Sequence, residues 1–329
     1  MADSKWDVVC IGNAIVDVLA HAEDAFLAKH GMAKDSMMLI DADRAETLYE
    51  AIGPAVQQSG GSAANTAAGI ASLGGTAAYI GKVADDQLGD IFAHDLKAGG
   101  IHFGTPRLVG GEPTARSFIL ITPDGHRTMN TYLGACVELT PDDVSADVVG
   151  GGQVLYLEGY LWDKPAAKEA FLKAARLAHH AGRKVALTLS DSFCVERHHQ
   201  SFVDLVRDHV DILFANEAEI KTLYRTSSFE DAAEEVRKLG KTGALTRSEN
   251  GSIVFDGDHW HTIPPMPTRV VDTTGAGDLY ASGFLYGVTH DLGIERSGHL
   301  AAICAAEVIS HVGPRPQASL AALLKEIVA

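Results

Sequence analysis

Apolar residues along this chain gather in short runs, separated by longer stretches in which they recur every three or four positions. Short runs stand at residues 6–11, 154–157, 184–189 and 210–215, and they predict buried strands. The longer stretches, such as 166–180, predict amphipathic helices. From about residue 153 onward strand and helix alternate regularly. This alternation predicts an α/β fold with a mostly parallel central sheet covered by helices on both faces.

A different pattern stands in the first half of the chain. Residues 114–121 and 127–133 are predicted strands, and the turn at 123–126, Pro-Asp-Gly-His, predicts that they form a hairpin. No internal repeat or low-complexity segment divides the sequence. The three glycines at 150–152 form a loop, because the same α/β pattern runs on both sides of them. We therefore expect a single domain over residues 1–329.

The heptapeptide at 272–278, Asp-Thr-Thr-Gly-Ala-Gly-Asp, follows a short β-branched run and precedes residues of helical spacing. It predicts a strand end, a glycine turn and a helix that begins near Gly275. Gly275 and Gly277 leave backbone amides bare, and the amino end of a helix attracts anions because its first amides are unpaired. Asp278 in the first turn either complements the helix dipole or acts as a general base beside this anion cradle.

A second glycine turn, Gly60-Gly61, precedes an alanine-rich helix predicted over 63–73, with Ser62 as its N-cap. The turn is either an ordinary connection or a place where bare amides meet a polar ligand. Asn65 lies one turn into this otherwise apolar helix, and a buried amide needs a hydrogen-bond partner. Asp17 poses a similar question because it interrupts an apolar strand, where an unpaired buried carboxylate is unfavourable.

Both glycine turns carry a family resemblance. Residues 272–278 resemble the C-terminal signature of the PfkB (ribokinase-like) family of carbohydrate and purine kinases, and residues 60–69 resemble its other signature. The likeness runs from about Val8 to about Gly313. It implies a ribokinase-like three-layer α/β/α domain. It also implies a small β-sheet lid, built from discontinuous segments around 14–41 and 112–133.

The resemblance implies a catalytic centre around the heptapeptide. Asp278 would be the base, and the amides of Gly275, Ala276 and Gly277 would hold the charge that develops on the phosphates. Arg127, just past the hairpin turn, is similar to the lid arginine that meets the transferring phosphate; otherwise it would be a solvated surface residue. A guanidinium suits that role because it is a permanent charge with fork geometry.

The arrangement Asn13-x-x-x-Asp17 resembles the adenosine-kinase branch of the family, in which the acid grips a sugar diol; the alternative is a strand-end acid on the surface. Tyr160 or Leu161 falls where this branch supplies a residue that stacks on the base, although simple packing also explains an aromatic beside a turn. The substrate-binding residues implied in this way are Asn13, Asp17, Gly60, Gly61, Asn65, Leu133 and Tyr160.

A third group of residues resembles the nucleotide and metal site of the family. Asn216 and Glu219 match an Asn-x-x-Glu motif that organises Mg²⁺, often through water, and by themselves they could form a capping box. Thr246 and Gly251 match a nucleotide-binding loop in which Ser248 replaces a glycine. ATP and Mg²⁺ are the implied cofactors, and a requirement for a monovalent cation such as K⁺ stays open. The nucleotide-binding residues implied are Asn216, Thr246, Gly251, Asp272 and Thr273.

Composition and missing motifs narrow the remaining classes. The formal net charge of −16 argues against nucleic acid or an anionic membrane as the main partner. No apolar run approaches the ~20 residues of a membrane span. The four scattered cysteines fit reduced thiols in a cytoplasmic protein. Only Gly12 stands where a dinucleotide-binding fold needs three glycines, which argues against an NAD(P)-dependent enzyme. Gly75 and Gly81, which precede Lys82, do not have the spacing of a P-loop, so a P-loop nucleotide site is excluded.

Together these expectations predict an ATP-dependent kinase that phosphorylates the 5′-hydroxyl of a purine nucleoside, adenosine first. The alternative is a PfkB-type sugar kinase acting on ribose, fructose or a related sugar. A non-catalytic binding module is disfavoured because Asp278 and its neighbouring glycines are all present. We expect a monomer rather than a homodimer formed through the edges of the lid.

Overall fold

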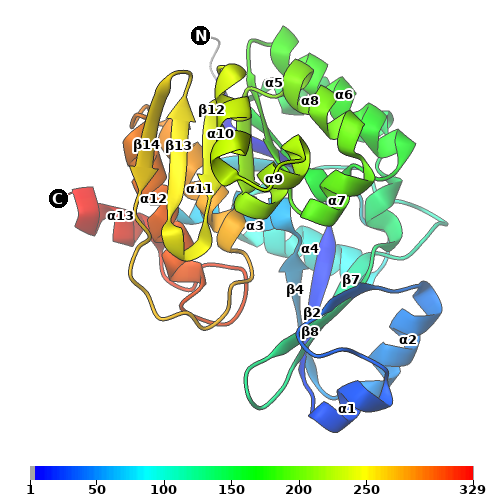
Figure 1. The fold of residues 1–329 in the computed structure, drawn as a ribbon. Coiled ribbons are helices and arrows are strands. Elements are labelled where there is room, and N and C mark those ends of the chain that lie inside the picture. The colour runs from blue at the N-terminus through cyan, green and yellow to red at the C-terminus, as the bar shows by residue number, and fades with distance from the viewer. Residues whose placement is uncertain (1–3, 329) are drawn as a thin grey trace.

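The computed structural model describes residues 4–328, and in this part of the chain the strands form two sheets (Figure 1). The larger sheet has the order β14-β13-β12-β11-β10-β9-β1-β5-β6. Its pairings from β6 to β12 are parallel, and β13 and β14 extend one edge in antiparallel fashion. The strands are β1 (Trp6–Ile11), β5 (Ala77–Ile80), β6 (His102–Phe103), β9 (Gly152–Glu158), β10 (Lys184–Thr188), β11 (Ile212–Asn216), β12 (Thr242–Thr246), β13 (Ser252–Asp256) and β14 (His259–Ile263).

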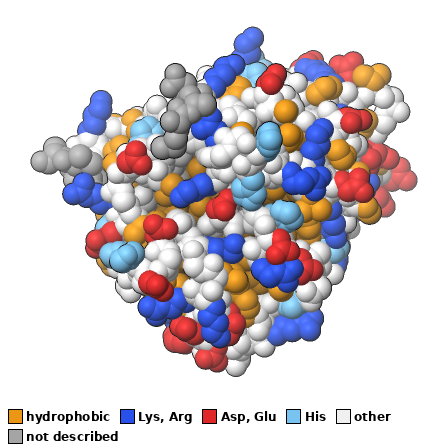
Figure 2. Space-filling view, turned by 90° about the horizontal axis from the view of Figure 1, so that it is seen from above, with side chains coloured by type: hydrophobic (Ala, Val, Ile, Leu, Met, Phe, Trp, Pro, Cys, Tyr) orange, Lys and Arg blue, Asp and Glu red, His pale blue; other side chains and the backbone are white. Residues whose placement is uncertain are grey.

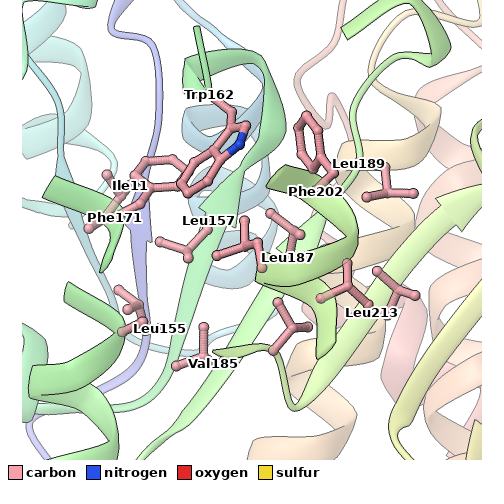
Figure 3. Close-up of a cluster of buried hydrophobic side chains, with 14 of the residues drawn as sticks. Ile11, Leu155, Leu157, Trp162, Phe171, Val185, Leu187, Leu189, Phe202 and Leu213 are labelled. Atoms are coloured by element: carbon pink, nitrogen blue, oxygen red, sulfur yellow. The ribbon is translucent and has the colours of Figure 1, made fainter. Parts of the chain in front are cut away.

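Helices cover both faces of this sheet because its central strands are apolar on both sides. Ile11, Leu157 and Leu187 lie on one face of the sheet, in a cluster with Phe171 and Phe202 (Figure 3). The helices on that face are α5 (Ala146–Gly150), α6 (Pro165–His180), α7 (Ser192–Arg197), α8 (His199–His209), α9 (Glu217–Tyr224) and α10 (Phe229–Lys238). The helices on the other face are α3 (Ser62–Ser72), α4 (Gln87–Ala98), α11 (Ala276–Thr289) and α12 (Ile294–Val308), and α13 (Leu320–Val328) packs beside them. The expected three-layer architecture is confirmed.

The smaller sheet projects from this body (Figure 1) and has the order β3-β8-β7-β2-β4. Two helices, α1 and α2, bury one of its faces around Phe118 and Leu48. Its elements are β2 (Ile15–His21), α1 (Asp24–Lys29), β3 (Met37–Leu39), α2 (Ala42–Ala51), β4 (Ala55–Gly60), β7 (Ala115–Ile121) and β8 (Arg127–Tyr132). The predicted hairpin is confirmed as β7 and β8, which pair antiparallel.

The first of the two segments expected for this sheet, 14–41, is too short. The sheet also includes β4, which pairs with β2 in antiparallel register from Ile15↔Gly60 to Ala20↔Ala55. The apolar pattern missed β4 because the strand is polar and its first residues are exposed. The expectation of one domain over 1–329 stays a prediction, and positions 1–3 and 329 lie outside the described residues.

The state of the cysteines and the distribution of charged side chains agree with what the composition predicts for the described residues. All four cysteines are free and buried. In the described part of the chain, no helix is both long and apolar enough to cross a membrane. Acidic and basic side chains are interspersed on the face seen in Figure 2.

Candidate active site

The candidate residues gather where the two sheets meet. Asn13 follows β1, Tyr160 follows β9 and Asn216 ends β11, so all three stand at the carboxyl ends of parallel strands. In open α/β sheets this edge is the usual place for a ligand, because the loops there diverge. Directly after Asn13 the chain enters β2 of the smaller sheet, which brings Asp17 to the same region.

The heptapeptide forms a glycine turn that ends in α11, as the sequence predicts. Gly275 is the N-cap of α11 with φ of 81°, and a Cβ at this position would lie 2.8 Å from Pro314 Cα. Only glycine satisfies both conditions. A Cβ at Gly277 would meet nothing within 4 Å, so open space borders its Cα. The amide of Ala276 donates to the carbonyl oxygen of Thr273 at 3.2 Å, so the expectation that this amide is bare is wrong. Gly275 and Gly277 remain the candidates for amides that meet a ligand at the amino end of this helix.

Asp278 joins the two glycine turns. Its Oδ1 accepts a hydrogen bond of 2.6 Å from Ser62 Oγ, and its Oδ2 accepts one of 2.9 Å from Asn65 Nδ2. Burial raises the pKa of Asp278 above its usual range, while these two donors and the charge of Arg315 oppose the rise. The partner that Asn65 needs is thus the proposed base.

Ser62 was expected to be the N-cap of α3, and this expectation is wrong. The N-cap is Gly61, with φ of 91° and no side-chain cap. Ser62 is the first helical residue, and its hydroxyl donates to Asp278 instead. The reason is tertiary: α3 and α11 pack closely, so the hydroxyl meets a buried carboxylate across the interface rather than an amide of its own helix.

The turn Gly60-Gly61 is a close approach of backbone and side chains rather than an ordinary connection. A Cβ at Gly61 would lie 2.3 Å from the carbonyl oxygen of Asn13, and one at Gly60 would lie 2.3 Å from Asp17 Oδ2. Asn13 Oδ1 and Asn65 Oδ1 are buried without a hydrogen-bond partner. Such acceptors need donors, and the hydroxyls of a sugar would supply them.

Asp17 is not a surface acid, since it lies inside β2 and is 6% exposed. Burial raises the pKa of Asp17 to about 7, against the opposing charges of Arg315 and Arg127. Its carboxylate accepts no hydrogen bond from any described residue, so both oxygens are available. A carboxylate of this kind can accept from two neighbouring hydroxyls.

Arg127 is also not a solvated surface residue. Its Nη1 lies 2.5 Å from Asp272 Oδ2, and the two side chains are 9% and 7% exposed. Arg127 Nη2 is buried without a hydrogen-bond partner. Asp272 also accepts hydrogen bonds from Thr274 and from the amide of Gly313. The first acid of the heptapeptide therefore anchors an arginine of the smaller sheet beside the glycine turn.

Asn216 and Glu219 form the capping box of α9. The Asn216 side chain accepts from the amide of Glu219, and the Glu219 carboxylate accepts from the amide and Nδ2 of Asn216. Burial raises the pKa of Glu219 to about 7. Among the described residues, no group of three or more His, Cys, Asp or Glu side chains could hold a metal ion. With its oxygens already engaged, this pair fits a Mg²⁺ ion that is held mainly by water and by phosphates.

The loop that follows β12 keeps a glycine-like backbone without the glycine. Ser248 has φ of 48° and Gly251 has φ of 77°, and a Cβ at Gly251 would lie 2.2 Å from Ile263 O. Ser248, which stands where the resemblance expects a glycine, thus itself adopts the left-handed conformation, and the role of this loop in nucleotide binding stays a prediction. A cavity of about 730 Å³ lies between this loop and α9, and its lining includes Asn216, Thr246 and Ser248.

The remaining predicted residues fall in different surroundings. Leu161 is 1% exposed in the core, whereas Tyr160 beside it is 38% exposed. The structure therefore leaves Tyr160 as the one of the two that a ligand can reach. Leu133 is half-buried at the end of β8, and Thr273 is exposed in the glycine turn.

Two residues of the site were missed by the sequence analysis. Glu158, the last residue of β9, accepts hydrogen bonds from the amide and Nδ2 of Asn13 and from the amide of Ala63. Arg315, in the loop before α13, donates from Nη2 to the carbonyl oxygen and the hydroxyl of Ser59. An acid at the end of an apolar strand was a readable signal for Glu158. Arg315 has no local signal except its place between two prolines.

Known proteins share this fold and these motifs. A model of the pfkB family of carbohydrate kinases matches residues 7–320. The structure is similar to that of an adenosine kinase from Sinorhizobium meliloti, with a TM-score of 0.90, 55% sequence identity, and coverage of 98% of this chain and 100% of that chain. It is also similar to a probable sugar kinase protein from Rhizobium etli CFN 42, with a TM-score of 0.91, 52% identity and coverage of 99% of both chains. An ATP-dependent ribose-1-phosphate kinase from Halopiger xanaduensis is 30% identical, over 86% of this chain and 94% of its own length.

Proposed function

Because the chain belongs to the pfkB family of carbohydrate kinases, we propose that it transfers the γ-phosphoryl group of ATP to the 5′-hydroxyl of a purine nucleoside. Adenosine is the first candidate. The observation that carries this proposal is the position of Asp278, held by Ser62 and Asn65 at the amino end of α11. The similarity to an adenosine kinase at 55% identity supports the choice of acceptor.

The chemistry follows from what surrounds Asp278. Its carboxylate accepts the proton of the 5′-hydroxyl while the new O–P bond forms and the bond between the γ-phosphorus and the β-phosphate oxygen breaks. ADP leaves with that electron pair. The amides of Gly275 and Gly277, at the amino end of α11, would stabilise the charge on the phosphate oxygens. Arg127 has a free Nη2 for the same purpose once it turns from Asp272.

The acceptor is oriented by groups that lack partners. Asp17 would accept from the ribose 2′- and 3′-hydroxyls, and the free oxygens of Asn13 and Asn65 would accept from the remaining donors. Gly60 and Gly61 bring the backbone against Asp17 and Asn13 and would contact the sugar there, and Tyr160 and Leu133 would border the base. The smaller sheet would act as a lid that excludes water during transfer.

Mg²⁺ and ATP would bind along the edge from the glycine turn to α9. Bound Mg²⁺ supplies charge neutralisation between the phosphates, and Asn216 and Glu219 would orient its waters. Thr246, Gly251, Asp272 and Thr273 would contact the nucleotide. Whether the activity requires a monovalent cation such as K⁺ is tested by comparing kcat/KM in Na⁺ and in K⁺.

The second candidate is the same reaction on a free sugar or sugar phosphate. It is favoured by the similarity at 52% identity to a probable sugar kinase protein. The nucleoside is preferred because Tyr160, which follows β9 at the same sheet edge as Asn13, is exposed and offers an aromatic surface for a base.

Two further proposals concern the setting of the protein. The four free cysteines fit a reducing, cytoplasmic compartment. We also propose that the protein is a monomer, and the molar mass measured by sedimentation tests this.

The first experiment measures kcat/KM for Mg-ATP-dependent phosphorylation of adenosine, guanosine, inosine, ribose, ribose 1-phosphate and fructose. Asp278→Asn is assayed beside the wild type and is expected to lower kcat at least about 10³-fold, because general-base assistance and the site's charge are lost together. A strong preference for adenosine that Asp278→Asn abolishes supports the proposal. A preference for a free sugar or sugar phosphate overturns the nucleoside assignment. Activity that survives Asp278→Asn overturns the role of Asp278.

A further inference from the structure

The loop between α12 and α13 contacts both glycine turns of the candidate site, at Gly275 and at Ser59 next to Gly60. Glu307 Oε1, at the end of α12, accepts hydrogen bonds from the amides of Gln317 and Ala318. The amide of Gly313 donates to Asp272, and Pro314 lies directly against Gly275. Contacts that do not involve Arg315 therefore hold this loop at Gly313, at Pro314 and at residues 317–318.

Arg315 extends from this loop to the smaller sheet. Its Nη2 lies 3.0 Å from the carbonyl oxygen of Ser59 and 3.2 Å from Ser59 Oγ, at the end of β4 and next to Gly60. The amide of Ser59 donates in turn to Asp95 Oδ2 at 2.7 Å. Arg315 Nε is buried without a hydrogen-bond partner. The guanidinium thus holds the residue that precedes the glycine pair and keeps one buried donor unused.

The charges around Arg315 are mostly negative. Asp17, Asp95 and Asp278 all act on it electrostatically. In the described residues, none of these carboxylates is within the 4.0 Å of an ion pair with Arg315. Arg315 instead donates to neutral atoms of Ser59. Its charge therefore acts on Asp17, Asp95 and Asp278 without forming an ion pair with any of them.

We propose that Arg315 is a positioning residue of the acceptor site, which holds the Ser59–Gly61 turn and adds a fixed positive charge near the carboxylates of Asp17 and Asp278. The inference rests on the proposed function, in which Asp17 holds the sugar and Asp278 takes its proton. Both carboxylates must be ionised together for that chemistry. Two acids in one dry site oppose each other's ionisation unless a cation lies between them.

The acids respond to Arg315 in the expected direction. Its charge lowers the pKa of Asp17 and the pKa of Asp278, both of which burial raises. Loss of that charge would therefore leave each acid protonated at higher pH. The other titratable groups that act on Asp278 do not carry positive charge; they are Asp17 from β2, Tyr156 and Glu158 from β9, and Tyr160 after it. Asp17 differs, because the charge of Arg127 from β8 lowers its pKa beside that of Arg315.

The test compares Arg315→Gln, which removes the charge, with Arg315→Lys, which keeps it but loses the fork. Arg296→Gln, an exposed arginine on α12, is the matched control. The first readout is the pH profile of kcat/KM. Arg315→Gln is expected to move the acidic limb upward by about one pH unit, the low end of the shift for a nearby opposite charge, and so to lower kcat/KM about tenfold on that limb. Arg315→Lys is expected to restore most of the profile.

The second readout needs no substrate. Carboxyl ¹³C signals of labelled aspartate are titrated in the free protein, with Asp17→Asn and Asp278→Asn used for assignment. Arg315→Gln is expected to raise the pKa of both acids, and Arg296→Gln is expected to leave them unchanged. Lower thermal stability with unchanged pKa values and pH profile would show a tether only and overturn the inference. If the wild type phosphorylates nothing in the panel, the proposed function fails, and the titration still decides the role of Arg315.

Discussion

Ser62 connects the first turn of α3 to the ionisation of Asp278. Its hydroxyl donates to Oδ1 at 2.6 Å, and this bond favours the charged form of the acid. Burial works in the opposite direction and holds the pKa of Asp278 above its usual range. An acid of this kind is protonated as pH falls through its pKa. A reaction that needs the carboxylate is therefore lost on the acidic side, at a higher pH than for an ordinary aspartate.

Ser62→Ala is expected to move this acidic limb further upward and to lower kcat about three- to tenfold. The reason is the loss of one hydrogen bond to a charged group, worth about 1 kcal/mol or somewhat more. The measurement is the pH dependence of kcat and kcat/KM. Ser227→Ala, at an exposed serine, serves as the control. An unchanged acidic limb would show that the hydroxyl only packs the two helices together.

At the scale of elements, Glu158 at the end of β9 holds the end of β1 to the start of α3. It accepts from Asn13 and from the amide of Ala63, and a Cβ at Gly12 would lie 2.3 Å from its Oε2. Burial raises the pKa of Glu158 to about 7. The folded protein thus binds this proton more tightly than the unfolded chain does. The contribution of Glu158 to stability is largest below its ordinary pKa and is lost as pH rises towards 7.

Glu158→Gln is expected to make the decline in unfolding free energy between pH 4.5 and 7 shallower, by about 3 kcal/mol over that interval. The amide also turns a donor towards Asn13 or Ala63, so we expect lower stability at every pH, by about 1–3 kcal/mol. Denaturant unfolding at several pH values measures both effects. Glu169→Gln, at an exposed glutamate on α6, is the control. An unchanged slope would contradict the buried titration of Glu158.

The elements also show where prediction from sequence succeeds. The central strands were predictable because helices cover both faces of the sheet. Strands buried in this way are apolar at nearly every position, so runs such as 154–157 are sufficient to identify them. Strand β4 was missed because its pattern is polar and half exposed, and only its pairing with β2 makes it a strand. Asp278 and Asn65 were each predicted as functional, but their direct hydrogen bond depends on the packing of α3 against α11. Arg315 lies 256 residues from its partner Ser59, a distance that no local pattern spans.

At the scale of the whole molecule, a nearly buried ion pair connects the smaller sheet to the main body. It joins Arg127 of β8 to Asp272 of the glycine turn. Asp272 also accepts hydrogen bonds from Thr274 and from the amide of Gly313, and neither of these involves the arginine. We therefore expect loss of the pair to affect the position of the sheet more than the fold of the turn.

Arg127→Gln is expected to speed amide hydrogen exchange in β7 and β8 at least severalfold and to lower kcat/KM, while exchange in the large sheet stays the same. Exchange measured by mass spectrometry on the free protein reports this directly. Arg107→Gln breaks an ion pair with Asp90 on the surface and serves as the control, since such pairs contribute little. Equal exchange in wild type and Arg127→Gln would show that other contacts hold the sheet.

The loop that carries Gly313, Pro314 and Arg315 is synthesised after the strands of both sheets. A ribosome that has translated up to α12 has already produced both sheets and both glycine turns. Yet the turn at Gly275 then lacks Pro314 against it, Asp272 lacks the amide of Gly313, and the acids of the acceptor site lack the charge of Arg315. The nascent chain can thus fold its scaffold early, while its phosphoryl-transfer site matures only once this loop has emerged.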